Sequence, residues 1–553
     1  MSLTHAQVQA QLTGPGQLFE IEEIGDTGVR TWKNAPASFR TLLELSRFHG
    51  DKVFLVYEDE HITFEDHFRR AATLANRLVE EYGVTKGDRV AIAMRNYPEW
   101  AVSFSAVLAA GAIAVPLNAW WTEAELAYGV SDSGAKVLIA DGERALRLAS
   151  TGVPLIVTRG ELPEGARAFT DVIGEPTADV TLPDVTLSPD DPATIFYTSG
   201  TTGRSKGALG SHRNIGQAPM TVAYGLARAS AVAGRDFATA AAVRRITLLT
   251  VPLFHVTGCF SAFITTLFSG GGLVLMYKWD PEQALRLIER ERVTAMIGVP
   301  TNAWQLMSHP DFGKYDLSSL STLGYGGAPA PPKLLERITQ NLPNRAPSNG
   351  YGMTETSALA IGNGGADYQA KPDSIGKPSP VVDVRVIDPM GADLPAGQVG
   401  ELCVRGPNVI LGYWNKPEAT AQTFIDGWVH TGDLAKIDEE GFVYIVDRAK
   451  DMVIRGGENV YCAEVEAALF EHPAVDDVAV IGVPHDELGE EVGMVVRPAP
   501  GQSITLEELQ TFLGDRIAKF KIPVHLWVRD TELPRNPGGK ILKTHLRREI
   551  LGG

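Results

Sequence analysis

The sequence predicts an α/β protein: a large N-terminal domain of stacked, mostly parallel sheets with helices on the faces plus a β subdomain, and a small α+β C-terminal domain. Three observations predict this architecture. Strand-like apolar runs alternate with helical periodicity across 38–141, which is typical of a parallel sheet covered by helices. Turn-rich, strand-like sequence fills 381–405. A charged segment, 447–451, precedes a further unit of about 100 residues with its own strands and helices.

The individual elements follow from this alternation. Strands are expected where apolar runs leave or enter a turn, at 52–57, 61–63, 86–94, 112–117, 137–140, 155–157, 193–197, 246–251, 295–300, 320–329, 442–446, 452–454, 475–483, 490–496 and 525–528. Helices are expected at 64–82, 99–111 and 463–470. A linker rich in Pro, Asp and Thr, 174–191, leads to the strand at 193–197. In a parallel sheet, ligands are expected at the carboxyl ends of the strands, where the glycine-rich loops lie.

One stretch, 246–277, is a candidate for a transmembrane segment. It carries no Asp, Glu, Lys or Arg and is long enough to span a bilayer. Pro252, Gly258 and the three glycines at 270–272 divide it, however. We therefore expect a strand, a loop, a buried helix and a strand, and no transmembrane segment.

Charge and cysteine content narrow the class of partner. The net charge of −17 over 553 residues argues against nucleic acid and anionic membrane surfaces as partners. A polyanionic ligand would have to be bound by local cations and backbone dipoles. Cys259, Cys403 and Cys462 are far apart and have no metal-ligand spacing, so a reducing cytoplasm is expected. Residues 1–23 lack the basic and apolar regions of a secretory signal.

The segment 197–209 carries the strongest functional signal. Glycines and Ser/Thr hydroxyls follow a predicted strand together with Arg204 and Lys206. Glycines allow a positive φ, and successive backbone N–H groups in such a turn bind anions. By composition alone an ordinary loop is the favoured interpretation, but the two cations beside the glycines favour phosphate binding. The P-loop NTPase pattern is met neither here nor at 538–541, where Ile541 replaces Ser or Thr.

Four further motifs could surround a bound phosphate. The glycines at 326–327 would let a flat ring approach the backbone, and Thr354 and Glu355 offer the hard oxygen ligands that Mg²⁺ prefers. Asp433 follows a tight glycine turn and could accept hydrogen bonds from ribose hydroxyls. Lys540 lies at the tip of a turn fixed by prolines and glycines. Each of these motifs has an ordinary structural explanation when taken alone.

Together and in this order, the motifs resemble those of the adenylate-forming superfamily, which comprises acyl- and aryl-CoA synthetases, nonribosomal-peptide adenylation domains and beetle luciferases. The chain is most similar to a bacterial-type fatty- or aryl-acyl-CoA synthetase. The resemblance covers nearly the whole chain, through 197–207, 350–356, 431–433, 447–451 and 534–540. It implies that a carboxylate attacks the α-phosphate of Mg·ATP, giving an acyl-adenylate and pyrophosphate, and that the thiol of coenzyme A (CoA) then displaces AMP. The implied cofactors are ATP, Mg²⁺ and coenzyme A.

The resemblance also implies a role for each matching residue. The residues that would hold the β- and γ-phosphates are Thr198, Ser199, Gly200, Thr201, Thr202 and Lys206. Those that would frame adenine are Gly327, Ala328, Asn349, Gly350 and Tyr351. Thr354 would contact the α-phosphate and Glu355 would bind the Mg²⁺. Asp433 and Arg448 would bind the ribose.

Two lysines would control the change from the first half-reaction to the second. Lys540 would bridge the carboxylate and the α-phosphate, and Lys450 matches the family's hinge. This divides the chain into 1–447, with the ATP and acyl sites, and a mobile domain, 448–553. Rotation about the hinge would withdraw Lys540 and bring a loop with Gly456 and Gly457 inward to shape the thiol channel.

The acid itself would lie against a mostly apolar wall. Its expected members are Phe254, His255, Cys259, Gly326, Gly350 and Met353, and His255, which closes one end of the pocket, is also placed in the catalytic set. No arginine marks a dicarboxylate, and 254–260 has no acid to pair with an amino group. A fatty or aryl acid is therefore predicted.

Several alternatives remain open at this point. The acyl group could pass to an amine or a carrier-protein thiol, or the chain could be a nucleotide-binding regulator. Arg455 and Lys521 could each meet a CoA phosphate or solvent. The chain length of the acid and a homodimer are likewise open.

Overall fold

The computed structural model describes residues 5–198, 204–234, 243–327, 330, 332–456, 458–536 and 539–552. Six residues with predicted ligand-binding roles lie outside the described residues, namely Ser199, Gly200, Thr201, Thr202, Ala328 and Gly457. No helix in the described ranges is long and apolar enough to cross a membrane.

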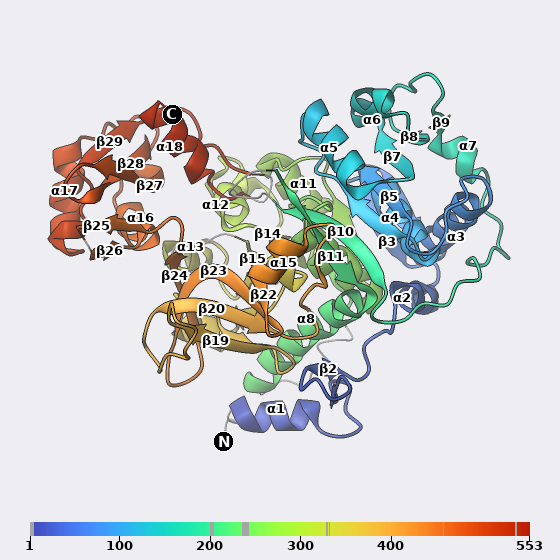
Figure 1. Ribbon diagram of the computed structural model, residues 1–553, viewed down its shortest axis with the longest axis horizontal. Coiled ribbons are helices and arrows are strands. Elements are labelled where there is room, and N and C mark those ends of the chain that lie inside the picture. The colour runs from blue at the N-terminus through green and yellow to red at the C-terminus, as the bar shows by residue number, and fades with distance from the viewer. Residues whose placement is uncertain are drawn as a thin grey trace.

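An eight-stranded sheet forms one layer of the N-terminal domain (Figure 1). Six strands run parallel in the order β10 (Pro192–Thr198), β6 (Ile113–Pro116), β5 (Arg89–Ala93), β7 (Val137–Asp141), β8 (Leu155–Thr158) and β9 (Arg167–Ala168). At the other edge, β11 (Lys206–Ser211) and β21 (Gly412–Tyr413) add antiparallel. Five strands predicted from the sequence are thus confirmed, whereas β11, the return strand of the glycine-rich segment, was not predicted.

A nine-stranded sheet forms the second layer. Its order is β18 (Lys377–Pro378), β17 (Ile361–Gly364), β16 (Ala346–Tyr351), β15 (Thr322–Gly326), β14 (Ala295–Gly298), β12 (Ile246–Leu249), β13 (Gly272–Leu275), β3 (Val53–Tyr57) and β4 (Glu60–Thr63). The strands from β16 to β3 are parallel. β4, β17 and β18 are antiparallel additions at the two edges.

The main core joins these two sheets through buried helices. The predicted apolar helix is α4 (Pro98–Ala109), in which Trp100 stacks on Phe104 with ring centroids 5.0 Å apart. The same core contains Phe263, from a π-helix at Thr257–Ile264. The stretch 246–277 is therefore a strand, a loop, buried helical turns and a strand, as predicted.

Other helices of the N-terminal domain cover the sheets or their edges. They are α1 (His5–Thr13), α2 (Phe39–Ser46), α3 (Phe64–Glu80), α5 (Glu123–Ser133), α6 (Gly142–Leu148), α7 (Phe169–Ile173), α8 (His212–Val232), α10 (Thr265–Ser269), α11 (Pro281–Arg290), α12 (Pro300–Ser308), α13 (Pro332–Asn341) and α14 (Ala366–Ala370). The long helix α8 was not predicted. It begins where the Ser211 side chain accepts a hydrogen bond from the Asn214 N–H, and Pro219 lies inside it.

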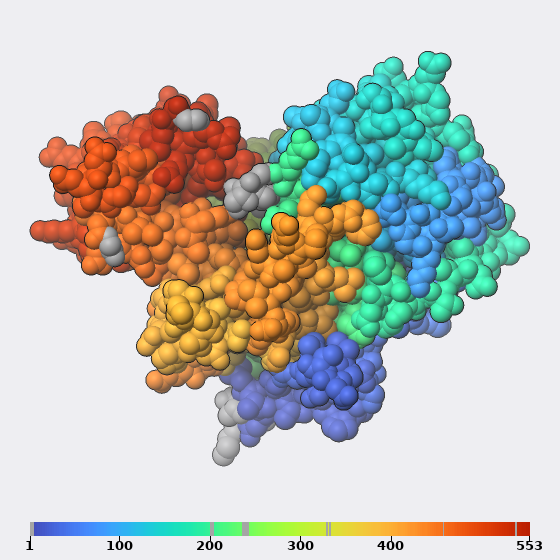
Figure 2. Space-filling view, viewed as in Figure 1, coloured from blue at the N-terminus to red at the C-terminus, as the bar shows by residue number. Residues whose placement is uncertain are grey.

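The β subdomain and the C-terminal lobe complete the chain. The subdomain contains β19 (Asp383–Ile387), β20 (Gly400–Arg405), β22 (Phe424–Ile425), β23 (Trp428–Ile437) and β24 (Val443–Arg448), with α15 (Pro417–Thr423) beside it. The lobe contains β25 (Val453–Arg455), β26 (Glu458–Val460), α16 (Cys462–Phe470), β27 (Val475–His485), β28 (Gly489–Pro498), α17 (Leu506–Gly514), β29 (His525–Val528) and α18 (Lys543–Leu551). Figure 2 shows this lobe standing out at the upper left, and it has its own apolar core.

Candidate nucleotide and acyl site

Glycines lie at the carboxyl ends of the neighbouring strands β15 and β16. Gly326 and Gly350 are partners in register, and a Cβ atom on Gly326 would lie 2.4 Å from the Gly350 carbonyl oxygen. Gly327 follows with φ +73°, and a Cβ placed there would meet nothing within 4 Å. Only glycines allow strands to approach so closely and leave the next backbone position open. Among the described residues of the predicted adenine site, Gly327 is therefore exposed, whereas Asn349, Gly350 and Tyr351 on β16 are partly buried.

The described ends of the predicted phosphate segment belong to two paired strands. β10 and β11 pair antiparallel, and Thr198 faces Lys206. The Thr198 hydroxyl donates to the Lys206 carbonyl at 3.5 Å. The Lys206 ammonium lies 4.6 Å from the centroid of the Tyr413 ring. The hairpin therefore directs one of its two predicted cations toward β21.

Glu355 contacts the same tyrosine as this cation and lies in a short 3₁₀ turn at Thr354–Thr356. The Tyr413 hydroxyl donates to Glu355 Oε1 at 2.6 Å. Burial raises the pKa of this carboxyl, although Tyr413, Arg448 and Lys206 each act to lower it. A carboxylate in low dielectric gains most from a nearby cation, and an oxygen ligand of this kind fits Mg²⁺. Tyr413 was not identified from the sequence, because its partner Glu355 lies 58 residues away.

The turn that carries Thr354 and Glu355 is conformationally demanding. Thr356 Oγ1 accepts a hydrogen bond from the Met353 N–H at 3.0 Å. Ser357 and Ala358 have φ of 51° and 78°, which side chains rarely adopt. A Cβ on Gly352 would lie only 1.4 Å from the Ala358 carbonyl oxygen. The backbone thus fixes the predicted α-phosphate and Mg²⁺ residues before any ligand binds.

The predicted ribose residues meet across two neighbouring strands. Asp433 on β23 is the register partner of Arg448 on β24, and Arg448 Nε lies 2.8 Å from Asp433 Oδ1. The Tyr351 hydroxyl donates to the other oxygen, Oδ2, at 2.6 Å. The Asp433 side chain is only 4% exposed. Residues assigned separately to adenine and to ribose therefore form one hydrogen-bonded group.

Glu401, which no sequence motif singled out, supports this group from the neighbouring strand. One carboxylate oxygen accepts the Gly432 N–H at 3.0 Å, and the other lies 3.0 Å from His430 Nδ1. Glu401, Cys403 and His430 could together offer three metal ligands within 4.8 Å of one another. Both oxygens of Glu401 already have partners, so we assign the trio to holding the turn that precedes Asp433.

The C-terminal lobe brings Lys540 against the N-terminal domain. Asn536 closes the loop by accepting the Lys540 N–H at 2.9 Å and donating its own N–H to the Lys540 carbonyl at 2.8 Å. A Cβ on Gly539 would lie 2.9 Å from Val299, just before α12, so the loop is packed on that residue. Burial lowers the pKa of Lys540 to about 8; Arg448 adds to this effect and Asp433 opposes it. The structure therefore places Lys540 within electrostatic range of Asp433 and Arg448, the predicted ribose residues.

Lys450 lies just after β24, where the lobe begins. Burial lowers the pKa of its partly exposed ammonium, and Arg448 lowers it further. Close by, the buried Asp447 accepts the Cys462 N–H, which ties the segment to the start of α16. The predicted hinge lysine thus occupies the connection between the lobe and β24.

Three residues of the predicted acid wall, Phe254, His255 and Cys259, follow β12, whereas Gly326, Gly350 and Met353 lie on or just after β15 and β16. The Phe254 and His255 rings are 4.9 Å apart, and the His255 carbonyl accepts the N–H of the buried Cys259 at 2.9 Å. His255 Nε2 is buried and, among the described residues, has no hydrogen-bond partner. Burial lowers the pKa of this imidazole to about 4, so it is neutral at physiological pH. Asn96, which the sequence did not single out, holds the loop by accepting the Leu253 N–H at 2.8 Å.

The two cations left open by the sequence both have acidic partners. Arg455 pairs with Glu491, whose side chain is 6% exposed. Lys521 Nζ lies 2.7 Å from Glu464 Oε1. Neither is a solvated charge, and neither is available to a phosphate unless it leaves its carboxylate. Next to Arg455, the N–H of Gly456 donates to the Leu488 carbonyl at 2.8 Å.

Comparison with known proteins agrees with this arrangement. The AMP-binding enzyme family matches residues 43–414, and the AMP-binding enzyme C-terminal domain matches 464–540. A feruloyl-CoA synthase of Amycolatopsis sp is 40% identical over 491 residues, covering 88% of this chain and 94% of its own. A long-chain-fatty-acid–CoA ligase of Bacillus subtilis (strain 168) is 33% identical, covering 90% and 92%.

A solved structure extends the likeness to three dimensions. The crystal structure of an anthranilate CoA ligase in complex with anthranoyl-AMP superposes with a TM-score of 0.83 at 27% identity, covering 93% of this chain and 97% of that one. The motifs, the fold and both domain matches agree. The chain belongs to the AMP-binding enzyme family and is an adenylate-forming acyl-CoA synthetase, an AMP-forming acid–thiol ligase.

Proposed function

We propose that this acyl-CoA synthetase activates an aromatic carboxylic acid with a polar ring substituent, similar to the feruloyl group named for its relatives, rather than a fatty acid. The 40% identity to feruloyl-CoA synthases, against 33% to a long-chain-fatty-acid ligase, supports this choice. The acid would lie against Phe254, His255, Cys259, Gly326 and Met353.

The unpartnered Nε2 of His255 carries this proposal. A buried polar atom without a partner costs about 1–3 kcal/mol, so a ligand that supplies a hydrogen bond is favoured over one that does not. An alkyl chain cannot supply that bond, whereas a hydroxyl or methoxy oxygen on an aromatic ring can. The neighbouring Phe254 ring offers a flat apolar surface to such a ligand.

The first half-reaction is assigned to residues of both domains. A carboxylate oxygen of the acid bonds to the α-phosphorus while the bond to pyrophosphate breaks, so negative charge builds on the α-phosphate. Lys540 stabilises that charge, with Thr354 as a hydroxyl contact. Asp433 and Arg448 hold the ribose, and Lys206 with residues 198–202 holds the leaving phosphates. Glu355 would hold Mg²⁺, which would neutralise phosphate charge there.

The second half-reaction requires the lobe to move. The CoA sulfur bonds to the acyl carbon, the bond to the phosphate oxygen breaks, and AMP leaves. Lys450 is the proposed hinge, so we place the domain boundary between 447 and 448. Rotation would withdraw Lys540 and bring the segment of Gly456 to the thiol path.

Two further predictions concern the cell. The cysteines Cys259, Cys403 and Cys462 are all buried and free, which supports a cytoplasmic protein.

A homodimer is the other open prediction. Light scattering of the purified protein will show whether its mass is one or two chains.

A panel of acids tests the substrate proposal. Ferulic acid, unsubstituted cinnamic acid and palmitic acid are compared by pyrophosphate release, with and without CoA. The expected order of kcat/KM is ferulic, cinnamic, palmitic. In His255→Phe the advantage of ferulic over cinnamic acid should disappear while cinnamic acid is still activated. A preference for palmitic acid, or an unchanged ferulic advantage in the variant, would refute the proposal.

A further inference from the structure

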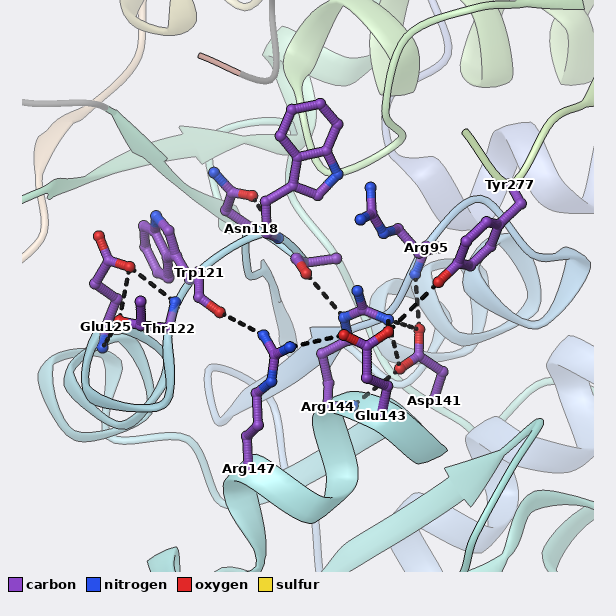
Figure 3. A network of polar contacts seen from close by, with 12 residues as sticks. Arg95, Asn118, Trp121, Thr122, Glu125, Asp141, Glu143, Arg144, Arg147 and Tyr277 are labelled. Atoms are coloured by element: carbon purple, nitrogen blue, oxygen red, sulfur yellow. Dashed lines mark hydrogen bonds and ion pairs between the residues drawn. The ribbon is translucent and has the colours of Figure 1, made fainter. Parts of the chain in front are cut away.

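Arg95 is an arginine flanked by two aromatic rings at the edge where both sheets end. It follows β5, its guanidinium carbon lies 5.0 Å from the ring centroid of Trp120, which follows β6, and 5.3 Å from that of Tyr277, which follows β13. In Figure 3 the guanidinium points away from the ion pairs below it and carries no dashed line. Strand ends of this kind are where open α/β sheets bind ligands.

The neighbouring carboxylates are used by other cations. Arg144 Nη1 lies 3.1 Å from Asp141 Oδ2 and 2.9 Å from Glu143 Oε2, and Arg147 Nη2 lies 2.7 Å from Glu143 Oε1 (Figure 3). From Arg95, Asp141 accepts a hydrogen bond only from the backbone N–H, at 3.0 Å. In the described part of the chain, the Arg95 guanidinium has no ion-pair partner, and its buried Nε has no hydrogen bond.

Arg159 shows what a satisfied arginine in the same setting looks like. Its guanidinium carbon lies 5.1 Å from the ring centroid of Tyr57 and 5.0 Å from that of Tyr97. It also forms a two-bond contact with Glu60, at 2.8 and 2.7 Å, and its Nε lies 2.9 Å from Glu99. Arg95 has the rings without the carboxylates. Burial lowers the pKa of Arg95 and Arg144 lowers it further, so a bound anion would relieve an unfavourable charge.

Arg95 is also connected to the acid wall. Its neighbour Asn96 donates to the Val251 carbonyl at 3.1 Å and accepts the Leu253 N–H at 2.8 Å. Phe254 and His255 follow directly. An anion on Arg95 would therefore lie on the same edge as the acyl pocket, and the Trp120 ring beside it is 46% exposed.

We propose that Arg95 binds a phosphate group of CoA during thioester formation, with Trp120 and Tyr277 fixing the plane of its guanidinium. The fork of N–H donors suits a phosphate, and an exposed indole can stack on the purine of the same ligand. Arg455 and Lys521 are held by Glu491 and Glu464, so they are less available. This inference rests on the CoA-dependent half-reaction stated above. A second carboxylate on the acid substrate has the same chemistry and is the rival source of the anion.

The test is Arg95→Met, with the two half-reactions measured separately. We expect ATP–pyrophosphate exchange driven by the acid to change by less than about twofold. With supplied acyl-adenylate, the KM for CoA should rise about ten- to hundredfold, which is the loss of a charge-assisted hydrogen bond. With pantetheine, which has the thiol but no phosphates of CoA, variant and wild type should react equally. Dephospho-CoA then identifies the phosphate, since an equal reaction with it assigns the 3′-phosphate and an undiminished defect assigns the pyrophosphate.

Other outcomes would overturn the assignment. An equal defect with pantetheine would show that Arg95 does not bind a phosphate. A defect confined to the KM of a dicarboxylic acid in the exchange assay would place the anion on the acid. Wild-type exchange without any thioester product would instead refute CoA as the acceptor.

Two further variants serve as controls for a general structural effect of the Arg95→Met substitution. Arg159→Met removes an arginine with the same two-ring setting and should leave the KM for CoA unchanged. Arg95→Lys keeps the charge but loses the planar fork, so it should recover part of the CoA affinity. If Arg95→Met does not fold, the same comparison with pantetheine is made in Arg95→Lys, where a KM for CoA equal to that of wild type refutes the proposal.

Discussion

Lys540 and Lys543 lie three residues apart at the end of one loop, and their surroundings are opposite. Lys543 Nζ lies 2.7 Å from Glu466 Oε1, which also accepts the Val480 N–H at 2.7 Å. Although burial opposes it, Glu466 raises the pKa of Lys543. Lys540 has no carboxylate within ion-pair distance among the described residues, and its pKa is lowered to about 8.

From this difference we infer that Lys543 stabilises the structure of the lobe, whereas the charge of Lys540 is available to a substrate. The Lys543–Glu466 pair anchors α18 to the core of the lobe. Arg535 anchors the other side of the loop, donating to the Gly539 carbonyl at 2.7 Å and contacting Asp477 Oδ2 at 2.6 Å. The charge of Lys540, which has no carboxylate at ion-pair distance among the described residues, could then be offered to a substrate and withdrawn by the proposed rotation of the lobe. The predictions below test this division.

Lys540→Ala should produce the largest effect. Removing a charge aimed at the reacting phosphate should reduce acid-dependent ATP–pyrophosphate exchange by about 10²–10³-fold. Thioester formation from supplied acyl-adenylate should keep most of its rate. Equal loss in both assays would refute the assigned role of Lys540.

Glu466→Leu should destabilise the lobe strongly, because it leaves the buried Lys543 cation without a partner. A loss of about 3–5 kcal/mol is expected, measured by urea unfolding. The double variant Glu466→Leu/Lys543→Met should recover most of that stability and retain pyrophosphate exchange. If the double variant lost exchange as Lys540→Ala does, Lys543 would have a catalytic role and the comparison would fail.

Asp433→Asn should weaken nucleotide binding. It removes the charge that pairs with Arg448 and accepts from Tyr351, so the KM for ATP should rise about tenfold or more. Asp383→Asn is the matched control, because Asp383 pairs with Arg405 at 2.9 Å within the β subdomain. An equal change of the KM for ATP in both variants would contradict a ribose role for Asp433.

The smallest expected effect is on pH dependence. The protonated form of Lys540 stabilises phosphate charge, so exchange should fall as pH rises through about 8. Asp451 raises that pKa, and Asp451→Asn should therefore move the alkaline limb to lower pH by less than about one unit. A pH–rate profile of kcat/KM for ATP measures the shift. A shift to higher pH would contradict the electrostatic assignment.

Local sequence patterns predicted much of this molecule, because strands, buried helices and glycine turns are encoded by near neighbours. The hairpin 52–63, helix α4 and the strand–helix–strand reading of 246–277 are examples. Helix α8 escaped prediction since Pro219 interrupts its pattern and Asn214, rather than Glu, follows its N-cap.

The site residues found only in the structure depend on distant partners. Tyr413 is identified by its hydrogen bond to Glu355, and Glu401 by the hydrogen bond it accepts from Gly432. Arg95 is identified by its contacts with the rings of Trp120 and Tyr277. In the sequence, an arginine after a strand resembles an ordinary surface charge. Only the fold shows that the neighbouring carboxylates are paired with other arginines. The acidic partners of Arg455 and Lys521 were equally invisible in sequence.

The contact between Gly352 and the Ala358 carbonyl sets a rule for engineering this enzyme. A library that varies the proposed acid pocket to change substrate range can sample Met353, which is predicted to contribute to its wall. Position 352 should tolerate no replacement for any acid, because even a methyl group would overlap the backbone. Sequencing the active survivors of such a library should therefore return glycine at 352 beside a varied 353. The first position would be constrained by backbone geometry, whereas the second would vary with the substrate range of the enzyme.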